Sequence, residues 1–358
     1  MGINEIIIYL MVIFMVIGAI DKCLGNRFGY GEKFEEGILA MGSLALAMVG
    51  VISLAPVLAK ILRPVISPIY SLVGADPAMF ATTLLANDMG GYPLAVELAL
   101  TPDAGKFAGL ILGAMMGPTL VFTIPVALGI IEKGDREFLA KGILAGIITI
   151  PLGCIVGGIV AGFPMEMILV NILPIIIVAL LIALGLWKAP EKMTKGFTVF
   201  GKGVVIVITI GLAAGIIEKL TCFVVIPGMA PLSEGFKIVG DIAITLAGAF
   251  PLVYFLTKVL KKPLSKMGEM LGMNEESAAG MVATLANSIP MFGLMKNMNN
   301  KGKILNVAFA VSGAFVFGDH LGFTAGVDKS MIFPMVVGKL VGGISAVILA
   351  KIMFKNVK

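Results

Sequence analysis

The sequence has 358 residues, of which 58% are hydrophobic and only 14% charged, and its formal net charge is +5. Soluble domains carry about 25% charged residues, so this composition excludes an ordinary soluble domain and favours a protein that resides in the lipid bilayer. The Lys and Arg residues lie mostly in short loops between apolar runs, which argues against a nucleic-acid partner. One histidine and three scattered cysteines give no metal-ligand spacing, so we expect no metal site and no cofactor.

Eleven apolar segments are predicted as helices, which indicates an all-α polytopic membrane protein. They lie near residues 3–20, 37–59, 78–98, 107–131, 138–162, 167–187, 197–217, 238–260, 277–295, 302–326 and 330–354. Most are about 20 residues long, which is the length that crosses a bilayer. Polar residues and helix breakers interrupt 78–98 and 277–295, so we expect broken or re-entrant helices there and nine to eleven transmembrane segments overall.

Several sequence matches recur in the same order and predict an internal repeat. They pair TLLAND (83–88) with ATLANS (283–288), MMGPTLVF (115–122) with VFGDHLGF (316–323), and GCIVGGIVA (153–161) with GKLVGGISA (338–346). The alternative is chance similarity among glycine-rich apolar helices. We interpret the matches as two related halves of about five segments each, residues 1–166 and 197–358. A transmembrane helix and loop over 167–196 would connect them.

The loop charges favour one topology. If all eleven segments cross, the Lys and Arg residues divide 14 to 12 between the two sides. If both interrupted segments return to the side from which they enter, the division becomes 6 to 20, with Lys339 inside the last helix. The positive-inside rule then places the N-terminus outside and the C-terminus in the cytoplasm. Nine crossings make the halves inverted repeats, a design typical of secondary transporters.

The stretch LLANDMGGYP (84–93) carries the first candidate site. Asp88 and Asn87 stand within an apolar run, beside the helix breakers Gly90, Gly91 and Pro93. A charge inside the membrane costs roughly 3 kcal/mol or more, so it usually faces a cavity or a partner. We predict that Asp88 and Asn87 bind substrate. The alternative is that Asp88 only caps the helix that restarts after the break.

A second candidate site lies in VFGDHLGF (316–323), where Asp319 stands beside the only histidine, His320. A structural Asp–His pair is the alternative, but both residues lie inside an apolar helix, and histidine titrates near neutral pH. We predict roles in substrate binding, with His320 as the candidate for proton coupling. Lys339, deep in the last helix, is predicted to be a counter-charge, with Asp319 as one partner, or to extend toward the interface.

The second interrupted segment contains LANSIP (285–290), where Asn287 and Ser288 offer neutral donors and acceptors and Pro290 marks the break. Substrate binding and helix capping are equally good interpretations of the two polar residues. Asp241 is the third carboxylate within an apolar segment, but it lies near the start of that segment and can reach the interface.

Long strings carry a resemblance to a known family. They are FEEGILAMGSLALAMVG (34–50), NDMGGYPLAVEL (87–98), MMGPTLVFTIPVALGIIE (115–132), AAGMVATLANSIPMFG (278–293) and FGDHLGF (317–323). The chain resembles the ethanolamine transporter family of the bacterial ethanolamine-utilisation system. The resemblance implies a multi-pass protein of the bacterial cytoplasmic membrane that takes up ethanolamine and is not an enzyme. It implies a facilitator or a secondary transporter, whose oligomeric state and ion coupling stay open.

Two alternatives stand beside this interpretation. One is a permease for another small amine or for a zwitterion. The other is an intramembrane aspartyl hydrolase that uses Asp88 and Asp319 as a catalytic dyad, since two carboxylates that share a proton can activate water. The residues before Asp319 are VFG and not the Gly-x-Gly of those enzymes.

Overall fold

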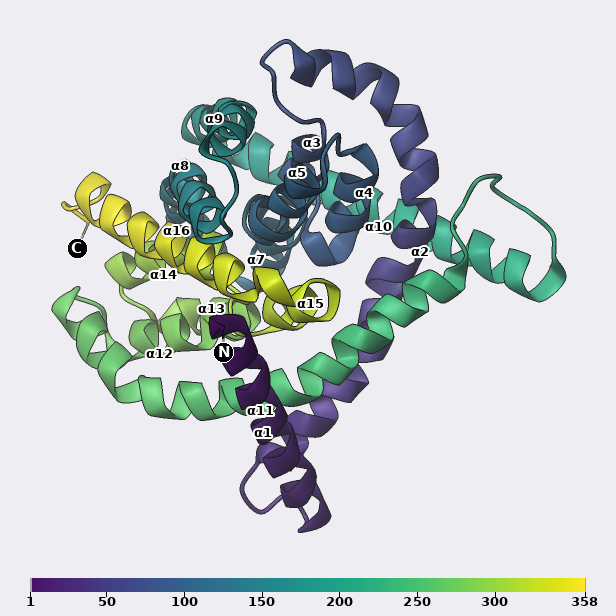
Figure 1. The fold of residues 1–358 in the computed structure, drawn as a ribbon. Helices are drawn as coiled ribbons and strands as arrows, with labels where there is room; N and C mark the ends of the chain where they lie inside the picture. Colours follow the sequence, from purple (N-terminus) through teal and green to yellow (C-terminus); the bar gives the residue numbers. More distant parts are fainter. Residues whose placement is uncertain (1, 358) are drawn as a thin grey trace.

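The computed structural model describes residues 2–357, apart from the side chains at 265 and 267, and each regular element within this part is a helix (Figure 1). Eight helical stretches of this part are long and apolar enough to cross a membrane: Ile3–Cys23, Tyr30–Ser71, Pro102–Ile130, Lys133–Val160, Met165–Lys188, Pro190–Thr221, Leu232–Met270 and Lys329–Met353. The prediction of an all-α polytopic protein is therefore confirmed. Eight is fewer than the predicted nine to eleven because the segments 78–98, 277–295 and 302–326 are each divided into shorter helices.

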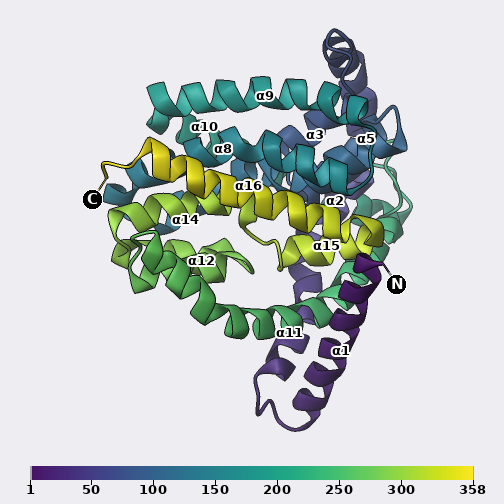
Figure 2. The same ribbon diagram turned by 60° about the vertical axis from the view of Figure 1, so that its left-hand side comes forward.

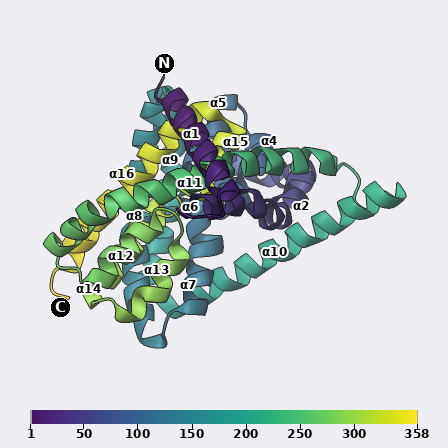
Figure 3. The same ribbon diagram turned by 90° about the horizontal axis from the view of Figure 1, so that it is seen from below.

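Two helices much longer than their predicted segments pack along each other. They are α2 (Tyr30–Ser71) and α11 (Leu232–Met270), and α1 (Ile3–Cys23) packs against both (Figures 1 and 3). Glycine allows α2 and α11 to approach closely, because a Cβ atom on Gly37 would lie 2.5 Å from the backbone nitrogen of Ala247. These helices lie to one side of the elements that carry the predicted site.

The predicted interruption of segment 78–98 is present. The segment consists of α3 (Ala78–Leu84), a short 3₁₀ turn η1 (Asn87–Met89) and α4 (Gly91–Leu98). The turn requires Gly90, whose φ of 90° lies in the left-handed region. The amide nitrogens of Met89 and Gly91 both donate to the carbonyl oxygen of Ala86, at 3.0 and 2.8 Å. Asn87 and Asp88 therefore stand on a tight loop between two helix ends.

The second interrupted segment is divided in the same way, into α12 (Glu275–Thr284), α13 (Ser288–Leu294) and a short turn η6 (Met295–Asn297). The prediction of an uninterrupted helix over 302–326 is wrong, because α14 (Asn300–Gly313) and α15 (Asp319–Val327) are separate helices. Between them Phe315 has a positive φ of 62°. The Phe315 and Phe317 amides donate to the carbonyls of Thr284 and Leu285, at 3.1 and 2.9 Å, so the two interruptions are hydrogen-bonded to each other.

Segment 102–130 is helical throughout but irregular. It contains α5 (Pro102–Lys106), η2 (Phe107–Ile111), η3 (Leu112–Ala114), α6 (Met116–Pro118), η4 (Thr119–Thr123) and α7 (Ile124–Ile130). The Thr101 hydroxyl caps its start by accepting from the Ala104 amide at 3.2 Å. Two of its turns, η2 and η4, are π-helical, and such wide turns occur often at functional sites.

The remaining helices enclose this segment. They are α8 (Arg136–Val160) after the turn η5 (Lys133–Asp135), α9 (Met165–Lys188), α10 (Pro190–Thr221), and α16 (Ile332–Met353) after the turn η7 (Lys329–Met331). Helices α8 and α16 lie side by side, and the Thr149 hydroxyl donates to the Gly342 carbonyl at 3.0 Å (Figure 2). Small residues at this contact bring two buried helices close enough for such a bond.

Candidate functional site

A small cavity brings together three of the residues that the sequence singled out. Asp88 reaches it from η1, and Asp319 and His320 reach it from the start of α15. The cavity has a volume of about 40 Å³. This volume accommodates roughly three water molecules, and therefore a solute of only a few non-hydrogen atoms.

The two carboxylates in this cavity have no directly bonded partner in the part of the chain that the structure describes. Neither Asp88 nor Asp319 makes a hydrogen bond or an ion pair with another described residue. Two carboxylates that line one small cavity repel each other. The arrangement therefore favours a cation between them.

A buried lysine holds the histidine of the cavity. Lys339 is only 1% exposed, and its Nζ lies 3.0 Å from Nδ1 of His320 and also donates to the Ala114 carbonyl. An ammonium group only donates, so a hydrogen bond from a charged Lys339 requires Nδ1 to accept, and the ring hydrogen of a neutral His320 then lies on Nε2. Among the described residues, Lys339 contacts His320 and the Ala114 carbonyl rather than Asp319, and its charge also acts on Asp88.

The other predicted site residues do not line this cavity. Asn87 is fully buried, and neither its amide nitrogen nor its amide oxygen has a partner among the described residues. Ser288 is also buried with an unpartnered hydroxyl, whereas the Asn287 side chain accepts from the Ile289 amide at 2.8 Å and caps α13. Asp241 is exposed on α11.

The predicted helix breakers shape the loop that carries Asp88. A Cβ atom on Gly90 would meet the Val51 side chain at 2.4 Å, and one on Gly91 would meet the Ala86 carbonyl at 2.6 Å. Pro93 and Pro290 both lie in the first turns of their helices, α4 and α13, where a missing amide hydrogen is tolerated.

Several residues of the cavity were not predicted from the sequence. Pro118, Phe122 and Phe315 complete its wall, and the two phenylalanine rings meet edge to face with centroids 5.6 Å apart. The Phe315 ring also lies 5.3 Å from the His320 ring. Aromatic faces next to carboxylates suit a small cation. The only sequence signal was the Gly-Pro pair at 117–118 within an apolar helix.

A larger cavity of about 310 Å³ lies elsewhere, between α1, α2 and α11. Its wall is mostly apolar, with side chains such as Ile8, Met11 and Phe34, and no carboxylate lines it. It lacks the convergent polar groups that a binding site for a small polar solute needs. The smaller cavity is therefore the better candidate for the functional site.

Comparisons with known proteins identify the family of the chain. A family model described as "Ethanolamine utilisation protein, EutH" matches residues 3–353. The "Probable ethanolamine permease EutH" of Listeria monocytogenes is 72% identical over 97% of this chain and 93% of its own length. The protein of the same description from Escherichia coli is 53% identical over 97% and 94%, and the "Uncharacterized protein YxeR" of Bacillus subtilis is 52% identical over 97% and 94%. No solved structure matches the chain. The chain belongs to the EutH family of ethanolamine utilisation proteins.

Proposed function

We propose that this protein carries ethanolamine across the bacterial cytoplasmic membrane, as a facilitator or a secondary transporter. The observation that carries the proposal is the small cavity with two unpaired carboxylates, Asp88 and Asp319, inside a multi-pass helical chain. Its relatives are named probable ethanolamine permeases. Ethanolamine is a small amino alcohol that is mostly cationic at neutral pH, so its ammonium matches the charge and size of this cavity.

The proposed binding mode assigns one role to each polar group. The ammonium lies between Asp88 and Asp319, where it offsets their repulsion. The hydroxyl oxygen accepts from Nε2 of His320, which Lys339 leaves free by donating to Nδ1. His320 is also the proposed proton-linked group, since it is the only imidazole of the chain and lines the cavity.

The cavity also bears on the alternatives. A zwitterion would place a third carboxylate beside Asp88 and Asp319, and this repulsion disfavours it relative to a simple amine. Because both carboxylates line one cavity, an aspartyl dyad is geometrically compatible with the site. The names of the relatives favour transport over hydrolysis, so we propose transport.

Two similar contacts, displaced by one residue in the alignment of the halves, support the proposed duplication of residues 1–166 as 197–358, joined by 167–196. In the first half, a Cβ atom on Gly117 would lie 1.9 Å from the Leu85 carbonyl oxygen. In the second half, a Cβ atom on Gly318 would lie 2.0 Å from the Ala286 carbonyl oxygen. Each interruption thus packs on a glycine at the matched position of the next segment. We propose that the halves are inverted repeats, with the N-terminus outside and the C-terminus in the cytoplasm, as the loop charges favour.

Uptake of labelled ethanolamine into liposomes that contain the purified protein tests the proposal. The assay uses mildly acidic pH (about 6), because little uncharged ethanolamine is then present to cross the lipid unaided. Asp88→Asn removes a charge-assisted contact worth about 1.5–3 kcal/mol, so we expect the apparent affinity to fall about 10- to 150-fold. An imposed proton gradient tests the coupling. Uptake by the unmodified protein that equals uptake by empty liposomes would refute the proposed function.

A further inference from the structure

Two irregular segments, one from each proposed half, lie antiparallel on either side of the cavity. The first is 102–130, and the second runs from α14 through α15. The Thr119 hydroxyl of the first donates to the Val311 carbonyl of the second at 3.1 Å, and the Phe122 and Phe315 rings are in contact. The two segments together supply Pro118, Phe122, Phe315, Asp319 and His320 to the cavity wall. A solute that enters the cavity along the interface between these segments has to separate them at one end.

A lysine–aspartate ion pair joins the two segments at each end. Lys106 lies at the start of the first segment, and its Nζ is 2.8 Å from a carboxylate oxygen of Asp328, just after the end of the second. Lys303 lies at the start of the second segment and pairs with Asp135, just after the end of the first. We name these contacts the N-side pair and the C-side pair.

The two pairs lie at opposite ends of a membrane-crossing helix. Lys106 is near the start of the stretch Pro102–Ile130, and Asp135 follows its end. Figure 3 shows α5 and α15 near the N-terminus at one end of the molecule, and α7 and α14 at the other. Figure 2 shows the same separation of α15 from α14. The cavity lies between the two pairs.

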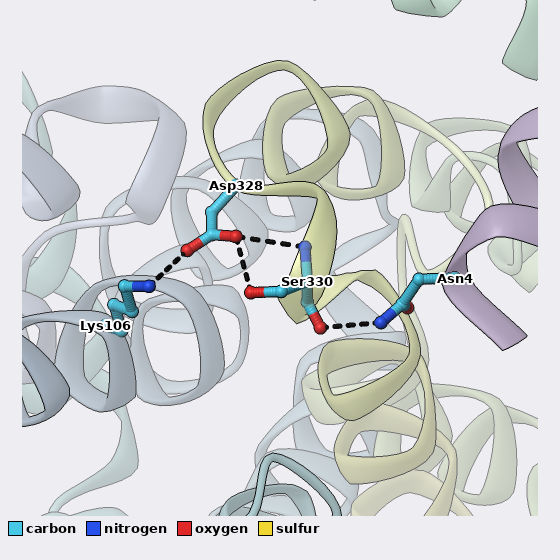
Figure 4. A network of polar contacts seen from close by, with 4 residues as sticks. All are labelled: Asn4, Lys106, Asp328 and Ser330. Carbon is cyan, nitrogen blue, oxygen red and sulfur yellow. Dashed lines mark hydrogen bonds and ion pairs between the residues drawn. The ribbon is translucent and has the colours of Figure 1, made fainter. Parts of the chain in front are cut away.

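The N-side pair belongs to a wider network. The Asp328 carboxylate also accepts from the amide and the hydroxyl of Ser330, at 2.9 and 2.6 Å (Figure 4). The Ser330 carbonyl accepts from the Asn4 side-chain amide at 2.8 Å, and the Asn4 side-chain oxygen accepts from the Phe333 amide at 2.9 Å. The network ties α1, α5 and the start of α16 together at this end.

The C-side pair is more deeply buried than the N-side pair. The side chains of Lys303 and Asp135 are 11% and 6% exposed, against 40% and 19% for Lys106 and Asp328. Removal of one partner from a buried pair leaves an uncompensated charge, whereas an exposed pair is partly replaced by water. Separation at the C-side end is therefore the more costly of the two.

We propose that the N-side pair and the C-side pair are the two gates of the transport path, and that they open in alternation. The inference rests on the proposed transport function. Both pairs are formed in this structure. Opening at either end breaks the pair at that end while the other pair holds the two segments together. The four charged residues thus determine transport without touching the solute.

Side-specific labelling of the cavity tests the gates. A Phe122→Cys variant is made in a background in which Cys23, Cys154 and Cys222 are replaced by Ala. A membrane-impermeant thiosulfonate that carries a quaternary ammonium is applied to intact cells and to inverted membrane vesicles. Asp328→Asn should raise labelling from the N-side about 2- to 5-fold, the range expected for a partly exposed pair. Labelling from the opposite side should not rise.

The C-side variant should increase labelling from the opposite side of the membrane. Asp135→Asn should raise labelling from the C-side about 10-fold or more, because this pair is buried. The double variant Asp135→Lys, Lys303→Asp, which retains an ion pair, should label like the parent. Glu137→Gln is the matched control, since its exposed ion pair with Lys141 lies within α8 and joins no two segments. If Asp135→Asn does not reach the membrane, the N-side variant decides the proposal by itself.

The proposal is overturned if Asp328→Asn labels like Glu137→Gln from both sides, or if both gate variants increase labelling from the same side. The labelling needs no ethanolamine, so its outcome is independent of the proposed function. Failure of the proposed function would instead appear as no uptake above empty liposomes by the unmodified protein.

Discussion

The contact between Gly117 and the first interruption gives the sharpest prediction. Gly117 lies in α6, and a Cβ atom added there would lie 1.9 Å from the Leu85 carbonyl oxygen and 2.6 Å from the Ala86 nitrogen. Both atoms belong to the backbone that leads into η1, so they cannot rotate away as a flexible side chain would. We predict that Gly117→Ala displaces the loop that carries Asp88.

The structure sets the size of that displacement. Real Cβ atoms stay about 3.0 Å or more from such an atom, so the backbone at Leu85 must move by at least about 1.1 Å. Overpacking of this kind costs about 1–3 kcal/mol, and a residue before a proline loses further freedom once it carries a Cβ atom. A misplacement of about 1 Å at a functional group can lower activity about 100-fold, and we expect a loss of that order in ethanolamine uptake.

The assay compares Gly117→Ala with Gly129→Ala in liposome uptake and thermal unfolding. Gly129 lies in α7 on the same segment, and an added Cβ atom there meets nothing within 4 Å. Its substitution should leave uptake unchanged and should stabilise the helix by up to about 1 kcal/mol. Equal uptake by the two variants would refute the reasoning, because the close approach at Gly117 would then have no influence on the position of Asp88.

Three further predictions concern polar groups near the cavity and at its N-side end. Asn87→Leu replaces a buried amide that has no partner among the described residues, so the unfolding temperature should not fall. Ethanolamine uptake should fall if Asn87 binds substrate, as the sequence predicts. A lower unfolding temperature would contradict that substrate-binding role. Lys339→Met removes the hydrogen bond to Nδ1 of His320, so the KM for ethanolamine should rise about 10-fold. The KM for ethylamine, which lacks the hydroxyl, should stay constant. Equal changes for both amines would exclude a role of Lys339 in hydroxyl recognition. Burial tends to raise the pKa of Asp328, but hydrogen bonds from Lys106 and Ser330 outweigh it and lower the pKa below its usual value of 3.8. The stabilisation by this carboxylate is thus fully present above about pH 4 and is lost as the pH falls through the lowered pKa. Asp328→Asn should therefore destabilise by about 0.2–1 kcal/mol equally at pH 5 and pH 7, with the difference from the parent shrinking below about pH 4.

Much of the helical architecture could be predicted from the sequence, because apolar runs of membrane length have few alternatives. The interruptions at Asn87 and Asn287 were predicted because polar residues and breakers stand out within such runs. The interruption at 314–318 was missed because its residues, such as Phe315 and Val316, are themselves apolar. It depends on hydrogen bonds to Thr284 and Leu285, and a linear pattern does not reveal such distant partners.

The same distinction applies to the cavity. Asp88, Asp319 and His320 could be predicted, since each is costly inside an apolar segment and needs a reason to be there. The aromatic wall formed by Phe122 and Phe315 could not, because phenylalanine is common throughout apolar helices. For Lys339 the sequence predicted a counter-charge to a buried carboxylate such as Asp319, or extension toward the interface. In the structure its Nζ contacts His320, and its charge also acts on Asp88.

The two hydrogen bonds between the interruptions of the second half have a mechanical consequence. Because the Phe315 and Phe317 amides are bonded to the carbonyls of Thr284 and Leu285, a shift of the end of α12 is transmitted along rigid backbone to the start of α15. Asp319 lies only two residues beyond Phe317, so we expect its carboxylate to shift together with this hydrogen-bonded backbone. The first interruption approaches Gly117 closely, but among the described residues no backbone hydrogen bond of this kind joins it to that segment, so the positions of Asp88 and Asp319 depend on different kinds of contact.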